Sequence, residues 1–145
     1  MSKLLYRLSA LVLVSAFLLI VYFGYMLLWP FNPVTLHSDP FPTDKKVYRH
    51  GDKLTYTLDF TKHINVPPKI SYHLVNGVSY PLTHGGVSRP MGNNKKHLQI
   101  VIPQDIPPGR YQLQIDLEYP INPVRKIYRI WQSTSFDILE EVDRK

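Results

Sequence analysis

Residues 109–118, GRYQLQIDLE, alternate apolar and polar side chains without a break. Tyr111, Leu113, Ile115 and Leu117 occupy one parity, and polar or acidic residues occupy the other. Successive side chains of a β-strand point to opposite faces of its sheet, so this stretch predicts a strand with one buried and one solvated face. The apolar face of such a strand must be covered by a second layer.

The same period of two recurs across most of the chain after residue 50. The further predicted strands cover Lys53–Thr61, Lys69–Val75, Val78–Leu82, Leu98–Ile102 and Lys126–Leu139. Asn76-Gly77 separates two of them and is typical of a two-residue hairpin turn. Breaks rich in proline and glycine separate the others, and short strands punctuated in this way are typical of an all-β sandwich or barrel.

Two turn motifs resemble those of immunoglobulin-like and fibronectin-like sandwiches. Ile106–Ile115, IPPGRYQLQI, is similar to the turn that leads into strand F, and Arg49–Tyr56, RHGDKLTY, is similar to the turn into strand B. The resemblance implies an antiparallel sandwich of about seven strands. It also implies that Tyr111 forms a tyrosine corner, with its ring in the core and its hydroxyl on the backbone. The chain has no cysteine, so such a sandwich would lack the disulfide of antibody domains.

An uninterrupted apolar run, Leu8–Trp29, lies before the strands. As a helix it is about 33 Å long, which is enough to cross a hydrocarbon core of about 30 Å. It is longer than the apolar core of a cleavable signal, and no A-x-A pattern follows it. Aromatic residues suited to a membrane interface lie near its ends, namely Tyr6, Tyr22, Tyr25 and Trp29. We expect an uncleaved transmembrane helix, and a secreted domain after signal cleavage is the alternative.

Basic residues near the apolar run indicate its orientation. Lys3 and Arg7 precede the run, and the first basic residue after it is Lys45. Because cytoplasmic flanks are enriched in lysine and arginine, we expect residues 1–7 in the cytoplasm. The C-terminal domain is then periplasmic or extracellular.

Four prolines punctuate the segment between the apolar run and the first strong strand pattern. They are Pro30, Pro33, Pro40 and Pro42, and they favour extended backbone over helix. We therefore expect a proline-rich stalk over residues 30–44, with a short strand possible at Val34–His37. The sandwich is expected over 45–139 and a charged tail over 140–145.

The sequence offers no constellation of catalytic residues. It has no nucleophile-elbow pattern and no glycine-rich phosphate loop. Asp116 and Glu118 are close in sequence, but they alternate with core residues of one strand and are expected on its solvated face. We expect a non-enzymatic protein without a cofactor.

Residues 83–97 form the longest stretch without a core pattern, and long loops in compact domains often carry function. Arg89, Lys95 and Lys96 lie in it without an acidic neighbour, so we expect them to bind an acidic partner, lipid head groups or a cell-wall polyanion. No aromatic residue is interleaved with them, which argues against nucleic-acid binding. The same stretch holds His84, Met91 and His97, whose imidazole and thioether groups suit copper and suggest a metallochaperone as an alternative function.

The stretch KIYRIW, Lys126–Trp131, carries apolar residues at both parities. A strand buried on one face needs apolar residues at one parity only, so we expect the other parity, Ile127 with Trp131, to face a partner or the stalk. A β-bulge that realigns the pattern is the other explanation. Together these features predict a single-pass module, tethered to a lipid bilayer, that binds a protein partner or a second copy of itself as an accessory, assembly or structural component.

Overall fold

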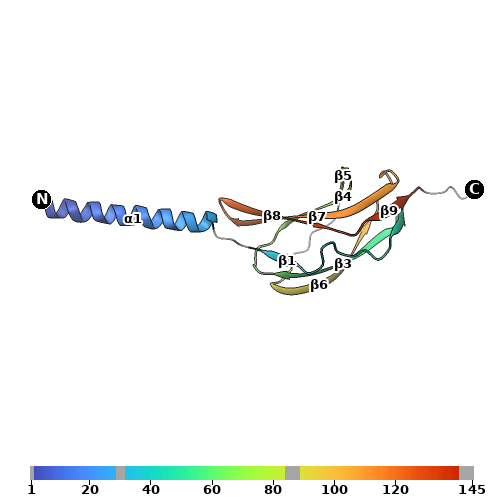
Figure 1. Cartoon of the computed structure of the whole chain (residues 1–145), viewed down its shortest axis with the longest axis horizontal. Helices are drawn as coiled ribbons and strands as arrows, with labels where there is room; N and C mark the ends of the chain where they lie inside the picture. The colour runs from blue at the N-terminus through green and yellow to red at the C-terminus, as the bar shows by residue number, and fades with distance from the viewer. Residues whose placement is uncertain (1, 29–31, 84–88, 141–145) are drawn as a thin grey trace, which may run out of the picture.

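The computed structural model describes residues 2–28, 32–83 and 89–140. Helix α1 (Ser2–Leu28) extends from one end of an elongated molecule, and the strands form the rest (Figure 1). Within α1, Tyr6–Leu28 has a mean hydropathy of 2.5 and none of it is buried against the remainder of the protein. The helix is long and apolar enough to cross a membrane, a property that it shares with signal sequences.

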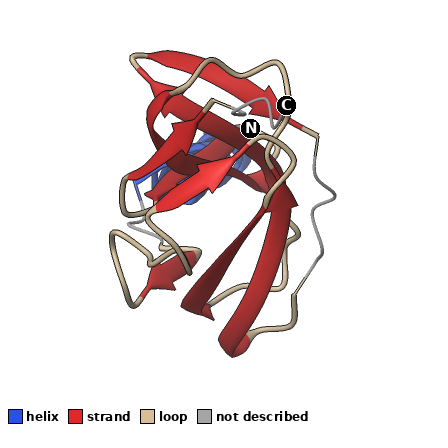
Figure 2. Cartoon of the chain, turned by 90° about the vertical axis from the view of Figure 1, so that its right-hand side faces the viewer, coloured by secondary structure: helices blue, strands red, loops and turns tan. Residues whose placement is uncertain are grey.

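Two β-sheets face each other in the described residues that follow α1. The strands are β1 (Val34–Leu36), β2 (Val47–Arg49), β3 (Lys53–Lys62), β4 (Lys69–Asn76), β5 (Val78–Leu82), β6 (Gly92–Val101), β7 (Gly109–Asn122), β8 (Arg125–Gln132) and β9 (Phe136–Leu139). One sheet has the order β1-β3-β6, and the other has the order β2-β9-β7-β4-β5 with β8 also beside β7. Figure 2 looks along the long axis and shows the strands in front of the helix. The all-β sandwich with one N-terminal helix is confirmed.

The core lies between the sheets and follows the predicted alternation. On β3 the even-numbered residues from Leu54 to Lys62 are buried, and on β7 the odd-numbered residues from Tyr111 to Tyr119 are buried. Gly77 alone lies between β4 and β5 and has a positive φ of 66°, whereas Asn76, expected in a two-residue turn, ends β4 and pairs with Val78.

Residues 34–44 differ from the expected stalk. β1 pairs with β3 in an antiparallel ladder, and Pro33 and Val34 are buried. Phe41 is 0 % exposed, and its backbone N–H donates to the carbonyl of Gln132 at 3.0 Å. β1 lies within the short strand considered at Val34–His37, but a free stalk is wrong for the rest of this segment, because it pairs with residues far away in the sequence.

The predicted final strand is divided into β8 and β9 at residues 133–135. Trp131 and Ser133 point into the core, and Phe136 and Ile138 continue inward at the opposite parity. The Oγ of Ser133 accepts a hydrogen bond from the N–H of Leu113 at 2.8 Å, which bridges the irregularity. A bulge therefore realigns the core pattern between β8 and β9.

Tyr111 has the geometry of a tyrosine corner. Its side chain is buried, and its hydroxyl donates to the carbonyl of Pro107, four residues upstream, at 2.7 Å. The hydrogen bond ties the start of β7 to the turn that leads into it.

We expect Tyr111→Phe to lower the free energy of unfolding by about 1 kcal/mol, because it removes this hydrogen bond and keeps the ring in place. Tyr128→Phe is the matched control, since Tyr128 is exposed on the neighbouring β8 and should change stability by less than about 0.5 kcal/mol. Urea unfolding of both variants measures the difference. Equal effects of the two substitutions would contradict a structural role for the Tyr111 hydroxyl.

Candidate functional site

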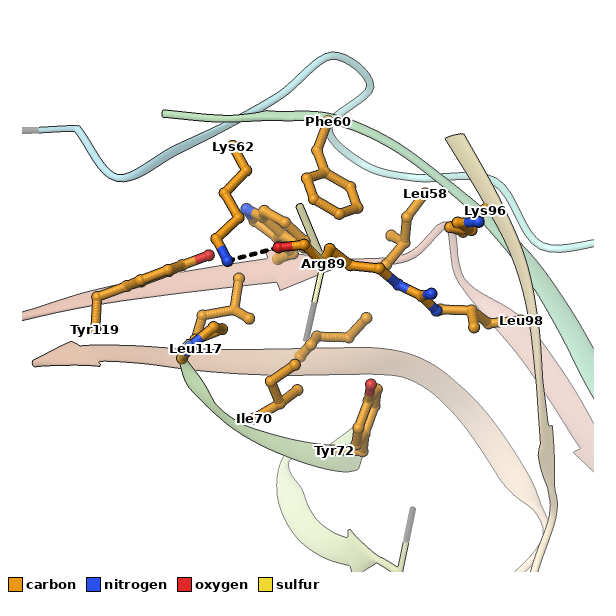
Figure 3. Close-up of a pocket in the computed structure, with 13 residues that line it drawn as sticks. Leu58, Phe60, Lys62, Ile70, Tyr72, Arg89, Lys96, Leu98, Leu117 and Tyr119 are labelled. Carbon is orange, nitrogen blue, oxygen red and sulfur yellow. Dashed lines mark hydrogen bonds between the residues drawn. The ribbon is translucent and has the colours of Figure 1, made fainter. Parts of the chain in front are cut away.

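A cavity of about 50 Å³ lies between the two sheets, and we call it the intersheet cavity. Its lining residues come from both sheets and from the segments beside them (Figure 3). They are Leu58, Phe60, Lys62, Pro68, Ile70, Tyr72, Arg89, Lys96, Leu98, Ile115, Leu117, Tyr119 and Trp131. The lining is apolar apart from two tyrosines and three cations.

The alternation of side chains along β3 and β7 places apolar residues in the walls of the cavity. Leu58 and Phe60 continue the even-numbered core face of β3, and Ile115 and Leu117 belong to the odd-numbered core face of β7. Across the gap, the rings of Phe60 and Trp131 lie 5.5 Å apart between centroids, with their planes at 45°. Such a contact favours close approach of the sheets at this point.

Lys62 is the most unusual residue of the cavity. Its side chain belongs to the core face of β3 and is only 3 % exposed. The ammonium Nζ donates a hydrogen bond to the backbone carbonyl of Arg89 at 2.7 Å (Figure 3). Burial lowers the pKa of Lys62 below its ordinary value, because the charged form has lost contact with water.

The sequence reasoning missed Lys62, although a signal was present. The residues of β3 at even positions are apolar from Leu54 to Phe60, and Lys62 falls next in the same parity. A lysine in phase with a core face is expected to be either a frayed strand end or a buried cation. In the structure, Lys62 is a buried cation.

Two of the three predicted basic residues line the same cavity. Arg89 is half-buried and Lys96 is exposed, and both are among its lining residues. Lys95 does not line the cavity. It lies opposite Asp59 in the β3–β6 ladder, whereas Lys96 lies opposite Leu58. Residues in direct register share a face of the sheet, so Lys96 is on the side of Leu58 and Lys95 is on the outer side.

The expected loop over residues 83–97 is shorter in the structure. β6 begins at Gly92 and pairs with β3 along its whole length, so Lys95, Lys96 and His97 are strand residues. Polar side chains such as those of Asn93 and Asn94 weakened the sequence pattern of this strand. Asn94 is nevertheless buried, and its amide donates to the carbonyls of Pro90 and Gly92.

The residues proposed to bind copper are not assembled into a site among the described residues. His84 lies outside the described residues, and Met91 is exposed. The ring of His97 is hydrogen-bonded at Nδ1 to Thr57 Oγ1 at 2.8 Å. Five strand positions, or about 17 Å, separate His97 from Gly92 beside Met91. No group of three or more metal-ligating His, Cys, Asp or Glu residues occurs in the described ranges.

The prediction that Ile127 and Trp131 face a partner is wrong. Trp131 is 6 % exposed and Ile127 is also buried, because they lie opposite the core residues Ile115 and Tyr119 of β7. The opposite parity of β8 faces outward instead. Tyr128 is 61 % exposed and Ile130 is 59 % exposed. We call Tyr128 and Ile130 the β8 surface.

One edge of β8 has no neighbouring strand in the described part of the chain. β8 pairs with β7 on one side, while β2 pairs with β9 and Phe41 forms an isolated bridge with Ser133. Further along β8, the guanidinium of Arg129 donates to Oδ1 of Asn32 at 3.1 and 3.3 Å. β8 lies at the end of the domain next to α1 (Figure 1).

The carboxylates of Asp116 and Glu118 each have a polar partner on the outer face of the second sheet. Glu118 Oε1 lies 2.6 Å from Nζ of Lys126, whose hydrogen bond lowers the pKa of Glu118. Asp116 accepts a hydrogen bond from Gln114 and lies 3.4 Å from Nε2 of His73. Both carboxylates therefore occupy the solvated face on which the alternation placed them.

Comparison with known proteins gives little that bears on function. No family model matches the chain, and no curated protein matches it. Among solved structures, a Niemann-Pick type C2 protein from Japanese carpenter ant is similar over 72 % of this chain and 98 % of that one. The identity is 10 % and the TM-score is 0.44. A similarity of this extent supports no inference about a ligand or a partner.

Proposed function

We propose that the chain is a single-pass membrane protein whose immunoglobulin-like domain lies outside the cytoplasm and binds a protein partner without catalysing a reaction. The observation that carries the proposal is the β8 surface, an apolar patch on an open strand edge beside the helix. The partner contributes an extended segment that pairs with this edge.

The character of α1 supports the membrane anchor. Its apolar window makes no buried contact with the domain, so a bilayer is the natural environment for these side chains. Tyr6 and Tyr25 are separated by 19 positions, or about 28 Å of helix, which matches the two interfaces of a hydrocarbon core. Lys3 and Arg7 at the N-terminal end favour the cytoplasm for that end.

The strand order and the tyrosine corner support an immunoglobulin-like domain. The second sheet places β4, β7 and the β8–β9 strand side by side, as strands C, F and G are placed in that fold. Tyr111 stands at the start of β7, where the corner tyrosine of strand F stands. Domains with this fold present their sheet faces and edges to many kinds of partner, so the fold alone assigns no ligand.

The β8 surface supports strand addition as the mode of binding. Edge strands of soluble domains are usually protected by charges, prolines or covering segments, because an open edge pairs with other chains. β8 has basic residues, and Phe41 bonds to the carbonyl of Gln132 at its end, but two large apolar side chains, Tyr128 and Ile130, also face outward. A partner strand would satisfy the open backbone of the edge, and its neighbouring side chains would cover Tyr128 and Ile130.

Chain length places this surface near the end of the helix. Asn32 bonds to Arg129 of β8 and lies four positions after Leu28, the last residue of α1. Four residues span at most about 14 Å. A partner strand on β8 is therefore close to the bilayer surface, which favours a partner that is itself a membrane protein.

The test replaces Tyr128 with a photo-crosslinking amino acid in the full chain in native membranes. We expect a discrete crosslinked species that disappears when Ile130→Asp is added, because a charge at that position opposes the apolar contact. Val78 is the matched control site, since it is similarly exposed but lies on β5 at the other edge of the same sheet.

Two outcomes would contradict the proposal. Equal crosslinking from positions 78 and 128, or crosslinking from 128 that Ile130→Asp leaves intact, would show that the β8 surface is not the contact. The intact mass of the same membrane-extracted protein tests the anchor separately. A mature N-terminus near residue 30 would show a cleaved signal instead.

A further inference from the structure

Lys62 is a buried cation for which the described residues supply no anion. An ammonium group has three hydrogen-bond donors, and the carbonyl of Arg89 accepts one of them. The salt bridges of the described residues involve His73 with Asp116 and Lys126 with Glu118, both on the outer face of the second sheet. Removal of a charge from water is unfavourable unless an opposite charge compensates for it, so buried cations are normally paired.

Two more cations line the same cavity, and the three differ in exposure. Lys96 is exposed, Arg89 is half-buried and Lys62 is buried. None of the residues that line the cavity is acidic. An anion in this cavity therefore compensates for the buried charge of Lys62.

The remainder of the cavity is suited to hydrocarbon. Phe60, Leu117 and Trp131 form its walls together with Leu58, Ile70 and Leu98. The volume of about 50 Å³ exceeds the roughly 10–15 Å³ that one water molecule needs. The apolar part of this lining is suited to apolar groups.

We propose that the intersheet cavity binds a single-chain amphiphile with an anionic head group. The head lies at Lys62, with Arg89 and Lys96 toward the outside, and the end of the hydrocarbon chain lies against Phe60, Leu117 and Trp131. In Figure 3 the ammonium of Lys62 and the hydroxyl of Tyr119 point toward the same region, which gives the head a second polar neighbour. This site is separate from the β8 surface, so each proposal can be tested independently of the other.

The anion explains the position of Lys62 better than its surroundings alone do. A lysine at a strand end ordinarily extends its charged tip into water while its stem covers apolar surface. Lys62 instead keeps Nζ inside, on the backbone carbonyl of Arg89. An anionic head supplies the charge-assisted hydrogen bonds that the described residues leave unmade.

The test uses quenching of Trp131 fluorescence by brominated amphiphiles. The full chain carries Trp29→Phe, so that Trp131 is the single tryptophan, and is placed in phosphatidylcholine nanodiscs. One arm titrates ω-bromooctanoate, and its neutral counterpart is ω-bromooctanol. We expect saturable quenching by the carboxylate at a concentration about tenfold or more below that for the alcohol, because only the carboxylate pairs with Lys62.

A second arm identifies the origin of the amphiphile. Nanodiscs that contain phosphatidylglycerol with brominated chains are examined without added carboxylate. Quenching of Trp131 in this arm indicates that a membrane lipid supplies the anionic head and the chain, whereas quenching in the first arm alone indicates a free amphiphile. Either result supports the proposal.

Lys62→Met separates the effect of the Lys62 charge on binding from the effect of its side-chain volume, since methionine keeps an unbranched apolar stem. We expect this variant to bind carboxylate and alcohol equally, with the affinity for the carboxylate reduced about tenfold. Lys53→Met is the matched control, because Lys53 is exposed at the other end of β3 and does not line the cavity. Arg89→Gln provides a second variant, with a smaller loss expected.

Several outcomes would overturn the inference. They are quenching that does not saturate, equal affinities for carboxylate and alcohol in the unmodified cavity, equal effects of Lys62→Met and Lys53→Met, and an absence of quenching in both arms. Unchanged Trp131 emission in the ligand-free variants checks that the fold is intact. If Lys62→Met does not fold, Arg89→Gln serves as the test variant. An unaltered affinity of that variant for the carboxylate also overturns the inference.

Discussion

A fragment that begins at residue 45 is expected to remain unfolded, whereas one that begins at residue 32 folds. The shorter fragment lacks β1 and the buried side chains of Val34 and Phe41. Phe41 lies against Tyr56 with ring centroids 5.6 Å apart, and its backbone exchanges hydrogen bonds with residues on both sides of Ser133. Loss of one buried phenylalanine typically costs about 3–5 kcal/mol, and whole domains are stable by only about 5–15 kcal/mol.

Circular dichroism and urea unfolding of the two fragments measure this difference. Phe41→Ala in the full chain gives an independent check and should lower the free energy of unfolding by about 3–5 kcal/mol. Val47→Ala is its control, because Val47 is an exposed strand residue in the same part of the sequence. A cooperative unfolding transition of the fragment 45–140, with the stability of the longer one, would restore the stalk interpretation.

The second large effect is expected at Trp131. Trp131→Ala should lower the free energy of unfolding by about 3–5 kcal/mol, because it removes a buried ring that contacts Phe60 of the opposite sheet. Ile130→Ala, at the adjacent position, should change stability by less than about 0.5 kcal/mol, since its side chain faces outward. Comparison of the two variants shows directly which face of β8 is buried.

Urea unfolding of the two variants in the full chain provides the comparison. A larger loss for Ile130→Ala than for Trp131→Ala would place the core on the other face of β8, and the register with β7 would then be shifted by one residue. The same result would remove the β8 surface as a docking site. Stability data alone therefore test the geometry on which the proposed partner contact depends.

The sequence predicted the strands that carry one clear parity and did not resolve the strand that carries two. β3 and β7 were evident because each apolar residue is followed by a polar one over the whole length. In β8 both parities are apolar, so only the pairing of Trp131 with Ile115 decides which one is buried. That pairing involves residues far apart in the chain, and local pattern contains no information about it.

The segment at residues 34–44 illustrates the same limit. Its prolines correctly exclude a helix, but extended backbone is equally compatible with a free stalk and with a strand of a sheet. Phe41 is buried because Ser133 and Tyr56 lie beside it, and those neighbours are more than ten residues away. A single bulky residue among prolines is too weak a signal to indicate burial.

The intersheet cavity was partly visible in the sequence. Of the three basic residues that the sequence pattern singles out, Arg89 and Lys96 line the cavity and Lys95 does not. Lys62 was readable from its parity on β3. The sequence does not predict that these residues lie close to Trp131 and Leu117, because a space between two sheets depends on the packing of both.

The parallel pairing of β2 with β9 has a mechanical consequence. β2 lies near the N-terminal end of the domain sequence and β9 near its C-terminal end, and they run in the same direction at Val47–Arg49 opposite 137–139. Tension applied to the chain after Leu139 against a fixed α1 therefore acts along these strands rather than across them. All the hydrogen bonds of this ladder must then break together, instead of one after another, before β2 and β9 separate.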